Sequence, residues 1–106
     1  MGALFLSIAI LAEVIGTTML KMSNGFKVVG PTILFVIFYI ASFYAFAQAL
    51  KTIDMGIAYA IWAAVGLTIV TLIGIIIFHE PINWIKALSI LFIVIGVVGL
   101  RLSSVN

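Results

Sequence analysis

Hydrophobic residues fill this chain in four long runs that are separated by short polar breaks. The runs cover about residues 3–20, 31–50, 56–78 and 82–100. Each is close to the roughly 20 apolar residues that a helix needs to cross a hydrocarbon core of about 30 Å. We therefore predict an all-α membrane protein whose four transmembrane helices form a single domain over residues 1–106.

The breaks between the runs carry turn signals. Asn24-Gly25 follows the first run, residues 51–54 follow the second, and residues 79–81 precede the fourth, where we expect the proline to start the helix. Since no Lys or Arg precedes Lys21, we interpret the first run as a spanning helix and not as a signal peptide. Short connections make consecutive helices antiparallel neighbours, so both termini are expected on one side of the membrane.

Composition strengthens the membrane interpretation. Of 106 residues, 66% are hydrophobic and only 8% are charged, which leaves too few polar side chains to cover a soluble protein. The net charge of +2 is scattered along the chain and does not form the basic patch expected of a nucleic-acid-binding protein. With no cysteine, disulfides and thiolate metal sites are excluded. We expect no metal, no cofactor and no enzymatic activity.

Positive charges are almost evenly divided between the two expected membrane faces. Lys21, Lys27 and Lys86 fall on one face, and Lys51 and Arg101 fall on the other. Because an excess of Lys and Arg normally fixes orientation, this balance favours insertion in both orientations. The alternative is that one loop dominates and fixes a single orientation.

Glu13 is the most informative residue, because it lies deep within the first apolar run. Ionisable residues inside a membrane are costly and usually functional, and no Lys or Arg lies at a similar depth to pair with it. Burial disfavours the charged form, so such a carboxylate can hold either a proton or a mobile cation. This chemistry suits proton-coupled cation exchange. The alternative is a protonated Glu13 that only bonds helices together.

Small and apolar residues share the helix face of Glu13, at offsets of three, four and seven. Those expected to line a pocket are Leu6, Ala9, Ile10, Gly16 and Thr17. The small ones leave room beside the carboxylate, although they would equally allow close helix packing. In the second run, Tyr39 and Ser42 are expected to donate hydrogen bonds toward the site, while Phe43 either lines it or is ordinary packing.

The third run offers an aromatic pair for a cation. Tyr59 and Trp62 are three residues apart and share a helix face, and Ala63 follows them as a further lining residue. Aromatic faces attract cations, Trp most strongly, so this pair suits a lipophilic organic cation. The alternative is an interfacial aromatic belt, which has most weight for Tyr59 near the end of the run.

In the fourth run, Ser89 and Gly96 lie seven residues apart on one face. Small residues in register let membrane helices approach closely, so we interpret this face as an assembly surface, with packing inside one protomer as the alternative. Four helices hardly enclose a path for an organic cation, and an oligomer is therefore expected.

Three segments together resemble the small multidrug resistance exporters. They are Ala12-Glu13-Val14-Ile15-Gly16-Thr17-Thr18, the pattern Lys21-x-Ser23-x-Gly25-Phe26, and Gly56-Ile57-Ala58-Tyr59-Ala60-Ile61-Trp62. The resemblance covers essentially the whole chain. It implies an antiparallel, dual-topology homodimer in the bacterial inner membrane that exports organic cations against proton entry by alternating access.

Carried onto this chain, the resemblance makes Glu13 the shared proton and substrate carboxylate, with Tyr59, Trp62 and Tyr39 as aromatic site residues. It assigns dimerisation to Ser89 and Gly96. The family often has Gly-x-Gly as a bend in the third helix, whereas this chain keeps only Gly66 as the hinge. The guanidinium-exporting branch typically has Trp where this chain has Gly16, so the sequence looks like the quaternary-ammonium multidrug branch. A guanidinium exporter and one half of a heterodimeric pair are the alternatives.

Overall fold

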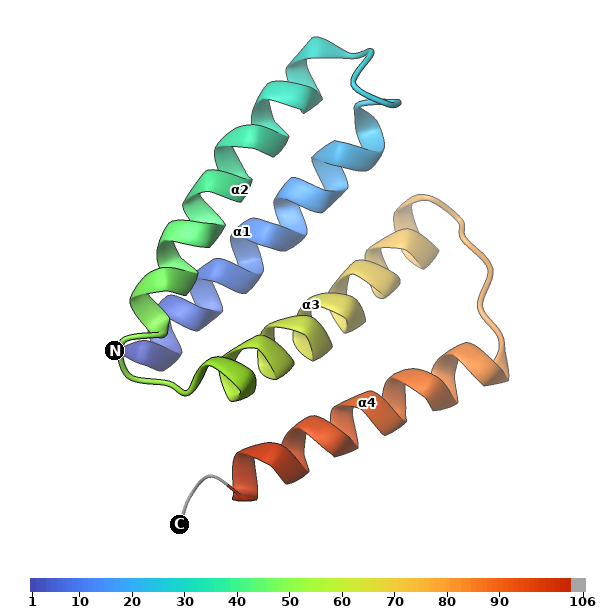
Figure 1. Ribbon diagram of the computed structural model, residues 1–106. Helices are drawn as coiled ribbons and strands as arrows, with labels where there is room; N and C mark the ends of the chain where they lie inside the picture. Colours follow the sequence, from blue (N-terminus) through green and yellow to red (C-terminus); the bar gives the residue numbers. More distant parts are fainter. Residues whose placement is uncertain (104–106) are drawn as a thin grey trace. The chain divides into compact units, whose positions relative to one another are not determined.

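The computed structural model of the protein describes residues 1–103, and within them it contains four helices and no strand. The helices are α1 (Gly2–Met22), α2 (Val29–Ala49), α3 (Met55–Ile77) and α4 (Trp84–Ser103) (Figure 1). They are 20 to 23 residues long, which corresponds to about 30 to 35 Å at 1.5 Å per residue. All four are long and apolar enough to cross a membrane, which confirms the all-α, four-helix fold class.

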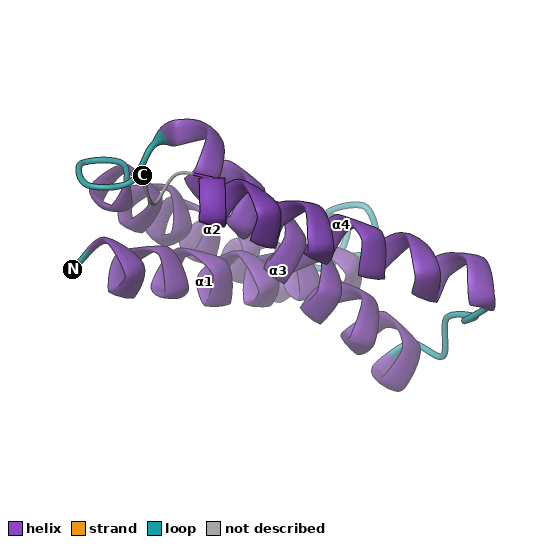
Figure 2. Cartoon of the chain, turned by 90° about the horizontal axis from the view of Figure 1, so that it is seen from below, coloured by secondary structure: helices purple, strands orange, loops and turns teal. Residues whose placement is uncertain are grey.

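The chain divides into two compact units, of which the first, Met1–Ile53, contains α1 and α2. These two helices run antiparallel and pack closely along their length (Figures 1 and 2). The start of α1 lies against the chain that leaves α2, because a Cβ atom added at Gly2 would meet the side chains of Thr52 and Ile53. The first helical pair is therefore held together at both ends.

The connection from α1 to α2 is a tight turn built on Ser23. The buried Ser23 hydroxyl donates to the Leu20 carbonyl oxygen at 2.6 Å and accepts the Phe26 N–H at 3.2 Å. Asn24, Gly25 and Phe26 all have positive φ angles of 50° to 70°. The Asn24-Gly25 turn signal thus marks the place where the chain reverses, with a left-handed backbone that glycine adopts without strain.

The second unit begins at Asp54 and contains α3 and α4. Helix α4 begins later than expected, because Pro81 lies outside the helix. Asn83 supplies the helix start: its Oδ1 accepts the backbone N–H of Lys86 at 2.8 Å, which is the usual capping arrangement. The prediction that proline starts this helix was wrong, since asparagine satisfies a free N–H of the first turn.

Apolar side chains are widely exposed along all four helices. Of the described residues of α4, none is buried in the single chain. Such surfaces would be unfavourable in water, because soluble proteins rarely expose large contiguous apolar patches. In a bilayer the same side chains face hydrocarbon, which agrees with the length of the helices.

Candidate functional site

Glu13 lies near the middle of α1 and is half-buried. Leu6, Ala9 and Ile10, on the turns before it, are buried, with Leu6 only 4% exposed. Helix α2 is fixed against this surface by Ser42, whose hydroxyl donates to the Ala9 carbonyl oxygen at 2.7 Å. Glu13 is therefore carried on the packed face of α1.

A chain of hydrogen bonds joins Glu13 to the second helix. The Thr17 hydroxyl donates to Glu13 Oε1 at 2.9 Å. The same Thr17 oxygen lies 2.7 Å from the Tyr39 hydroxyl oxygen. A threonine hydroxyl has one hydrogen, so when Thr17 donates to Glu13 the Tyr39 hydroxyl must donate to Thr17. The hydrogen bonds then run in one direction, from Tyr39 to Thr17 and from Thr17 to Glu13, so that the carboxylate is the final acceptor.

Gly16 is the reason that Tyr39 can lie so close to α1. A Cβ atom added at Gly16 would be 2.5 Å from Tyr39 Cδ1 and 2.8 Å from Cε1. Carbon atoms in ordinary contact are about 3.5 to 4.0 Å apart. The tyrosine ring therefore occupies the space that any side chain at this position would need. The absence of a side chain at Gly16 therefore lets the Tyr39 ring pack directly against the backbone of α1.

An aromatic row on α2 holds the Tyr39 ring in place. Phe35 lies on one side with a ring-centroid distance of 4.6 Å, and Phe43 lies edge-on at 6.0 Å on the other. Phe26 in the preceding turn extends the row, 6.0 Å from Phe35. Phe43 is nevertheless 54% exposed, so one side of the row remains open. Sequence reasoning missed Phe35, although its offset of four from Tyr39 placed both on one helix face.

Ser42 has a different role from the one expected. It is only 1% exposed, and its single hydroxyl hydrogen is used by the backbone of α1 and not by the Glu13 side chain. A buried serine with this bond joins two membrane helices at a point of close approach.

The aromatic pair lies in the second unit, near the start of α3. The rings of Tyr59 and Trp62 meet edge to face, with centroids 5.5 Å apart and planes at 81°. Tyr59 is 58% exposed and Ala63 is also exposed, whereas Trp62 is half-buried. This T-shaped geometry leaves the tyrosine ring accessible while the neighbouring ring supports it.

Gly66 is buried within α3, which continues as one α-helix through that position to Ile77. On α4, Ser89 and Gly96 are exposed in the single chain. The Ser89 hydroxyl donates to the Ile85 carbonyl of its own helix at 2.7 Å, and a Cβ atom at Gly96 would meet nothing within 4 Å. The space beside Gly96 is thus open, and the Ser89 hydroxyl makes its bond within its own helix.

The amino-acid sequence is similar to those of known membrane transporters. The family model described as Small Multidrug Resistance protein matches residues 1–95. The quaternary ammonium compound-resistance protein QacH of Staphylococcus saprophyticus is 40% identical over 101 residues, which cover 95% of this chain and 94% of QacH. The multidrug transporter EmrE of Escherichia coli (strain K12) is 41% identical over 101 residues, covering 95% and 92%.

A third relative carries a name of a different kind. The nicotine metabolites export pump subunit NepA of Paenarthrobacter nicotinovorans is 40% identical over 99 residues, which cover 93% of this chain and 85% of NepA. All three relatives therefore match nearly the full length of the chain, including the segments that carry Glu13 and the aromatic pair.

Proposed function

This chain belongs to the small multidrug resistance family, and from that premise we propose that it exports lipophilic and quaternary ammonium cations in exchange for protons. Members of this family are membrane transporters and not enzymes. The chain is a multi-pass bacterial membrane protein with four spanning helices. Within this proposal the four helices act as one transmembrane domain.

The observation that carries the proposal is the Glu13 carboxylate with its hydrogen-bonded neighbours. The Thr17 hydroxyl lies 2.9 Å from Glu13 Oε1, and the Tyr39 hydroxyl lies 2.7 Å from the Thr17 hydroxyl. A carboxylate binds a proton or a cation but gains little from binding both, because one positive charge neutralises it. Competition for Glu13 between these two ligands is the basis of exchange, and small hydroxyl donors are able to reorient as the ligand changes.

Gly16 supports the quaternary ammonium branch over a guanidinium exporter. The Tyr39 ring fills the space beside Gly16, so this arrangement of α1 and α2 cannot accommodate the tryptophan that is typical of guanidinium exporters. QacH and EmrE are themselves named for quaternary ammonium resistance and multidrug transport. In our proposal, the buried residues Leu6, Ala9 and Ile10 give Glu13 apolar surroundings on α1.

The aromatic pair supplies the attraction for the organic part of the substrate. An accessible Tyr59 ring supported by Trp62 offers a π face to a positive charge, an interaction worth about 0.5 to 2 kcal/mol depending on desolvation. Quaternary ammonium ions cannot donate hydrogen bonds, so aromatic faces and the negative charge of a carboxylate suit them better than a polar cage does.

The working unit in this proposal is an antiparallel homodimer that opens to the two sides of the membrane in turn. The balanced Lys and Arg residues favour both orientations, and the Ser89–Gly96 face of α4 supplies the contact between copies. Gly66 is the position at which α3 would flex. Alternating access then keeps Glu13 open to one side at a time.

The decisive experiment replaces Glu13 with Gln in the purified, reconstituted protein. Glu13→Gln keeps the shape of the side chain and removes its charge, so uptake of tetraphenylphosphonium driven by a proton gradient should fall to the level of empty vesicles. The matched control is Glu80→Gln, which changes a carboxylate outside the helices and should leave transport intact. Normal proton-driven uptake by Glu13→Gln would rule out the proposal.

The heterodimeric alternative has support in the name of NepA, which is one subunit of an export pump. Expressing this chain alone separates the two cases, because a homodimer should confer resistance to a quaternary ammonium compound by itself. Adding two lysines within residues 52–54, or instead beside Asn24-Gly25, should fix opposite orientations. Each variant alone should be inactive, and the two together should restore resistance. Full resistance from one fixed-orientation variant would contradict the antiparallel arrangement.

A further inference from the structure

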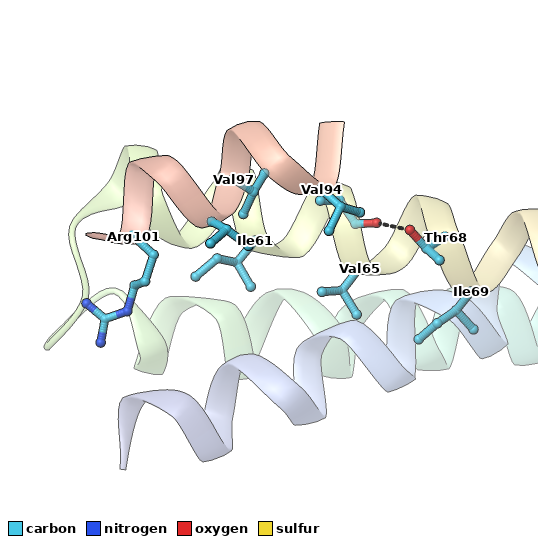
Figure 3. Close-up of a pocket in the computed structure, with 9 residues that line it drawn as sticks. Ile61, Val65, Thr68, Ile69, Val94, Val97 and Arg101 are labelled. Atoms are coloured by element: carbon cyan, nitrogen blue, oxygen red, sulfur yellow. Dashed lines mark hydrogen bonds between the residues drawn. The ribbon is translucent and has the colours of Figure 1, made fainter. Parts of the chain in front are cut away.

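An apolar cavity of about 410 Å³ lies between α3 and α4 of the second unit (Figure 3). Its lining consists of valines, isoleucines and one alanine, with two polar exceptions, Thr68 and Arg101. The Thr68 hydroxyl donates to the Ala64 carbonyl of its own helix at 2.8 Å, so its only hydrogen is already used. An occupant of the cavity interior therefore does not need to accept a hydrogen bond from Thr68.

The lining residues form a strip that runs along the two helices. From Ile61 to Ile69 on α3 the strip covers eight residue steps, or about 12 Å, which approaches the roughly 15 Å depth of one hydrocarbon leaflet. Several of these side chains, including Val65 and Val98, are exposed, so the strip is open toward the surroundings. Its shape suits a single extended hydrocarbon chain.

Arg101 lies at one end of this strip, in the last turn of α4 (Figure 3). It is exposed, and a guanidinium group at the end of a spanning helix lies at the depth of the lipid head groups. Its planar donors recognise phosphate in a bidentate manner. An apolar strip with a cation at its membrane-surface end has the charge and polarity pattern of one phospholipid, with the acyl chain along the helices and the phosphate at Arg101.

A second copy of the chain is a less suitable occupant if it docks on the assembly face. Gly96 is two residues from both Val94 and Val98, which line the cavity. At about 100° per residue, Gly96 is rotated by roughly 100° from Val97 and by roughly 160° from Val94 and Val98, the three valines of α4 that line the cavity. Contact through the Ser89–Gly96 face would therefore leave the Val94 and Val98 side of the cavity open to lipid.

We propose that the α3–α4 cavity is a binding site for an anionic phospholipid, with its phosphate on Arg101 and one acyl chain along Ile61, Val65, Val94 and Val98. The site would hold a bilayer lipid against the least buried helix of the chain. This inference depends only on the membrane location of the protein. Its test measures lipid binding and not transport, so it can fail while the proposed export activity stands.

The test uses the full chain in vesicles of phosphatidylcholine with a minor fraction of phosphatidylglycerol. Either lipid carries a photoreactive group midway along an acyl chain, and the attached residues are identified by mass spectrometry. We expect phosphatidylglycerol to label Val94 and Val98 roughly fivefold more than phosphatidylcholine does at equal amounts, given one arginine near the surface. Equal labelling by both lipids, or labelling confined to the Ser89–Gly96 face, would overturn the proposal.

Two variants of equal charge change separate the head-group contact from general attraction. Arg101→Gln should reduce phosphatidylglycerol labelling to the phosphatidylcholine level, whereas Lys86→Gln, at the opposite end of α4, should leave the preference unchanged. Equal effects of the two variants would contradict the role of Arg101. Circular dichroism confirms that each variant keeps its helices.

A third variant tests whether protein occupies the cavity instead. The chain contains no cysteine, so Val94→Cys introduces a single thiol near the middle of α4, where antiparallel copies carry the same position at the same membrane depth. In an anionic-lipid site, disulfide cross-linking between copies at this position should be weak and the thiol should react with a lipid-soluble maleimide. Efficient cross-linking between copies would mean that a second chain covers the cavity, and the proposal would be wrong.

Discussion

The contact between Gly16 and Tyr39 gives a sharp test of the packing that supports Glu13. In Gly16→Ala, the new methyl group would lie 2.5 Å from Tyr39 Cδ1, so the ring must retreat by roughly 1 Å to reach normal contact distance. The Phe35 ring, whose centroid is 4.6 Å from that of Tyr39, restricts this movement. The hydrogen bond from Tyr39 to Thr17, now 2.7 Å, would then stretch beyond bonding distance.

The magnitude follows from three terms. Overpacking costs about 1 to 3 kcal/mol, and losing one hydrogen bond between membrane helices costs about 0.6 kcal/mol. The better helix propensity of alanine returns up to about 1 kcal/mol. We therefore expect Gly16→Ala to lower the free energy of unfolding by roughly 1 to 3 kcal/mol. Unfolding with SDS in detergent micelles, followed by circular dichroism at fixed protein concentration, measures this change.

Two comparisons make the result decisive. Gly30→Ala places the same methyl group on α2 where nothing lies within 4 Å, so it should be neutral or slightly stabilising. In a Tyr39→Ala background the obstructing ring is absent, and Gly16→Ala should no longer destabilise the protein. The reasoning is refuted if Gly16→Ala costs no more than Gly30→Ala does, or costs the same with and without the tyrosine ring.

Two further substitutions test single contacts in the two units. Ser42→Ala removes the donor to the Ala9 carbonyl and should lower the free energy of unfolding by about 0.6 kcal/mol. The control is Ser7→Ala, because the Ser7 hydroxyl donates to a carbonyl of its own helix. Equal losses of stability in the two variants would contradict the interhelical role of Ser42. Gly74→Ala places a methyl group where the Glu80 carboxylate lies against α3. Because the carboxylate is the far end of a flexible side chain, it should move aside and leave the loop in place. Hydrogen exchange of the Glu80 amide, which donates to the Gly74 carbonyl, should therefore stay nearly unchanged, and exchange about tenfold faster would contradict this.

Much of the fold could be predicted from the lengths of the apolar runs and from the polar breaks between them. Each apolar run is as long as a bilayer is thick, and the backbone of a spanning segment must satisfy its own hydrogen bonds, so four helices follow directly. The turn at Asn24-Gly25 was predictable for a similar local reason, since glycine accepts a positive φ angle. The start of α4 was not, because Pro81 and Asn83 both favour a helix start and only the cap geometry decides between them.

The site was predictable in its faces and not in its contacts. Spacing placed Thr17 on the face of Glu13, and the hydrogen bond between them lies within one helix. Contacts across helices depend on the rotation of α2 about its axis, which an apolar run of almost uniform hydrophobicity does not specify. This is why Ser42 was expected near the carboxylate although it bonds the Ala9 carbonyl, and why Phe35 was missed.

The two groups of site residues differ in how far a single chain completes them, and this difference bears on assembly. The bonds from Tyr39 through Thr17 to Glu13 are all made inside the α1–α2 unit, one within α1 and one between the two helices. By contrast, Tyr59 is 58% exposed, beside Trp62 on the same helix. A cation held by an exposed ring gains about 0.5 to 1 kcal/mol, whereas a desolvated ring provides about 2 kcal/mol or more. An aromatic site of this kind reaches its full strength only when further protein covers the ring. The need to desolvate that pair is therefore a physical reason, independent of charge balance, for further protein to pack against the aromatic pair when it binds a cation.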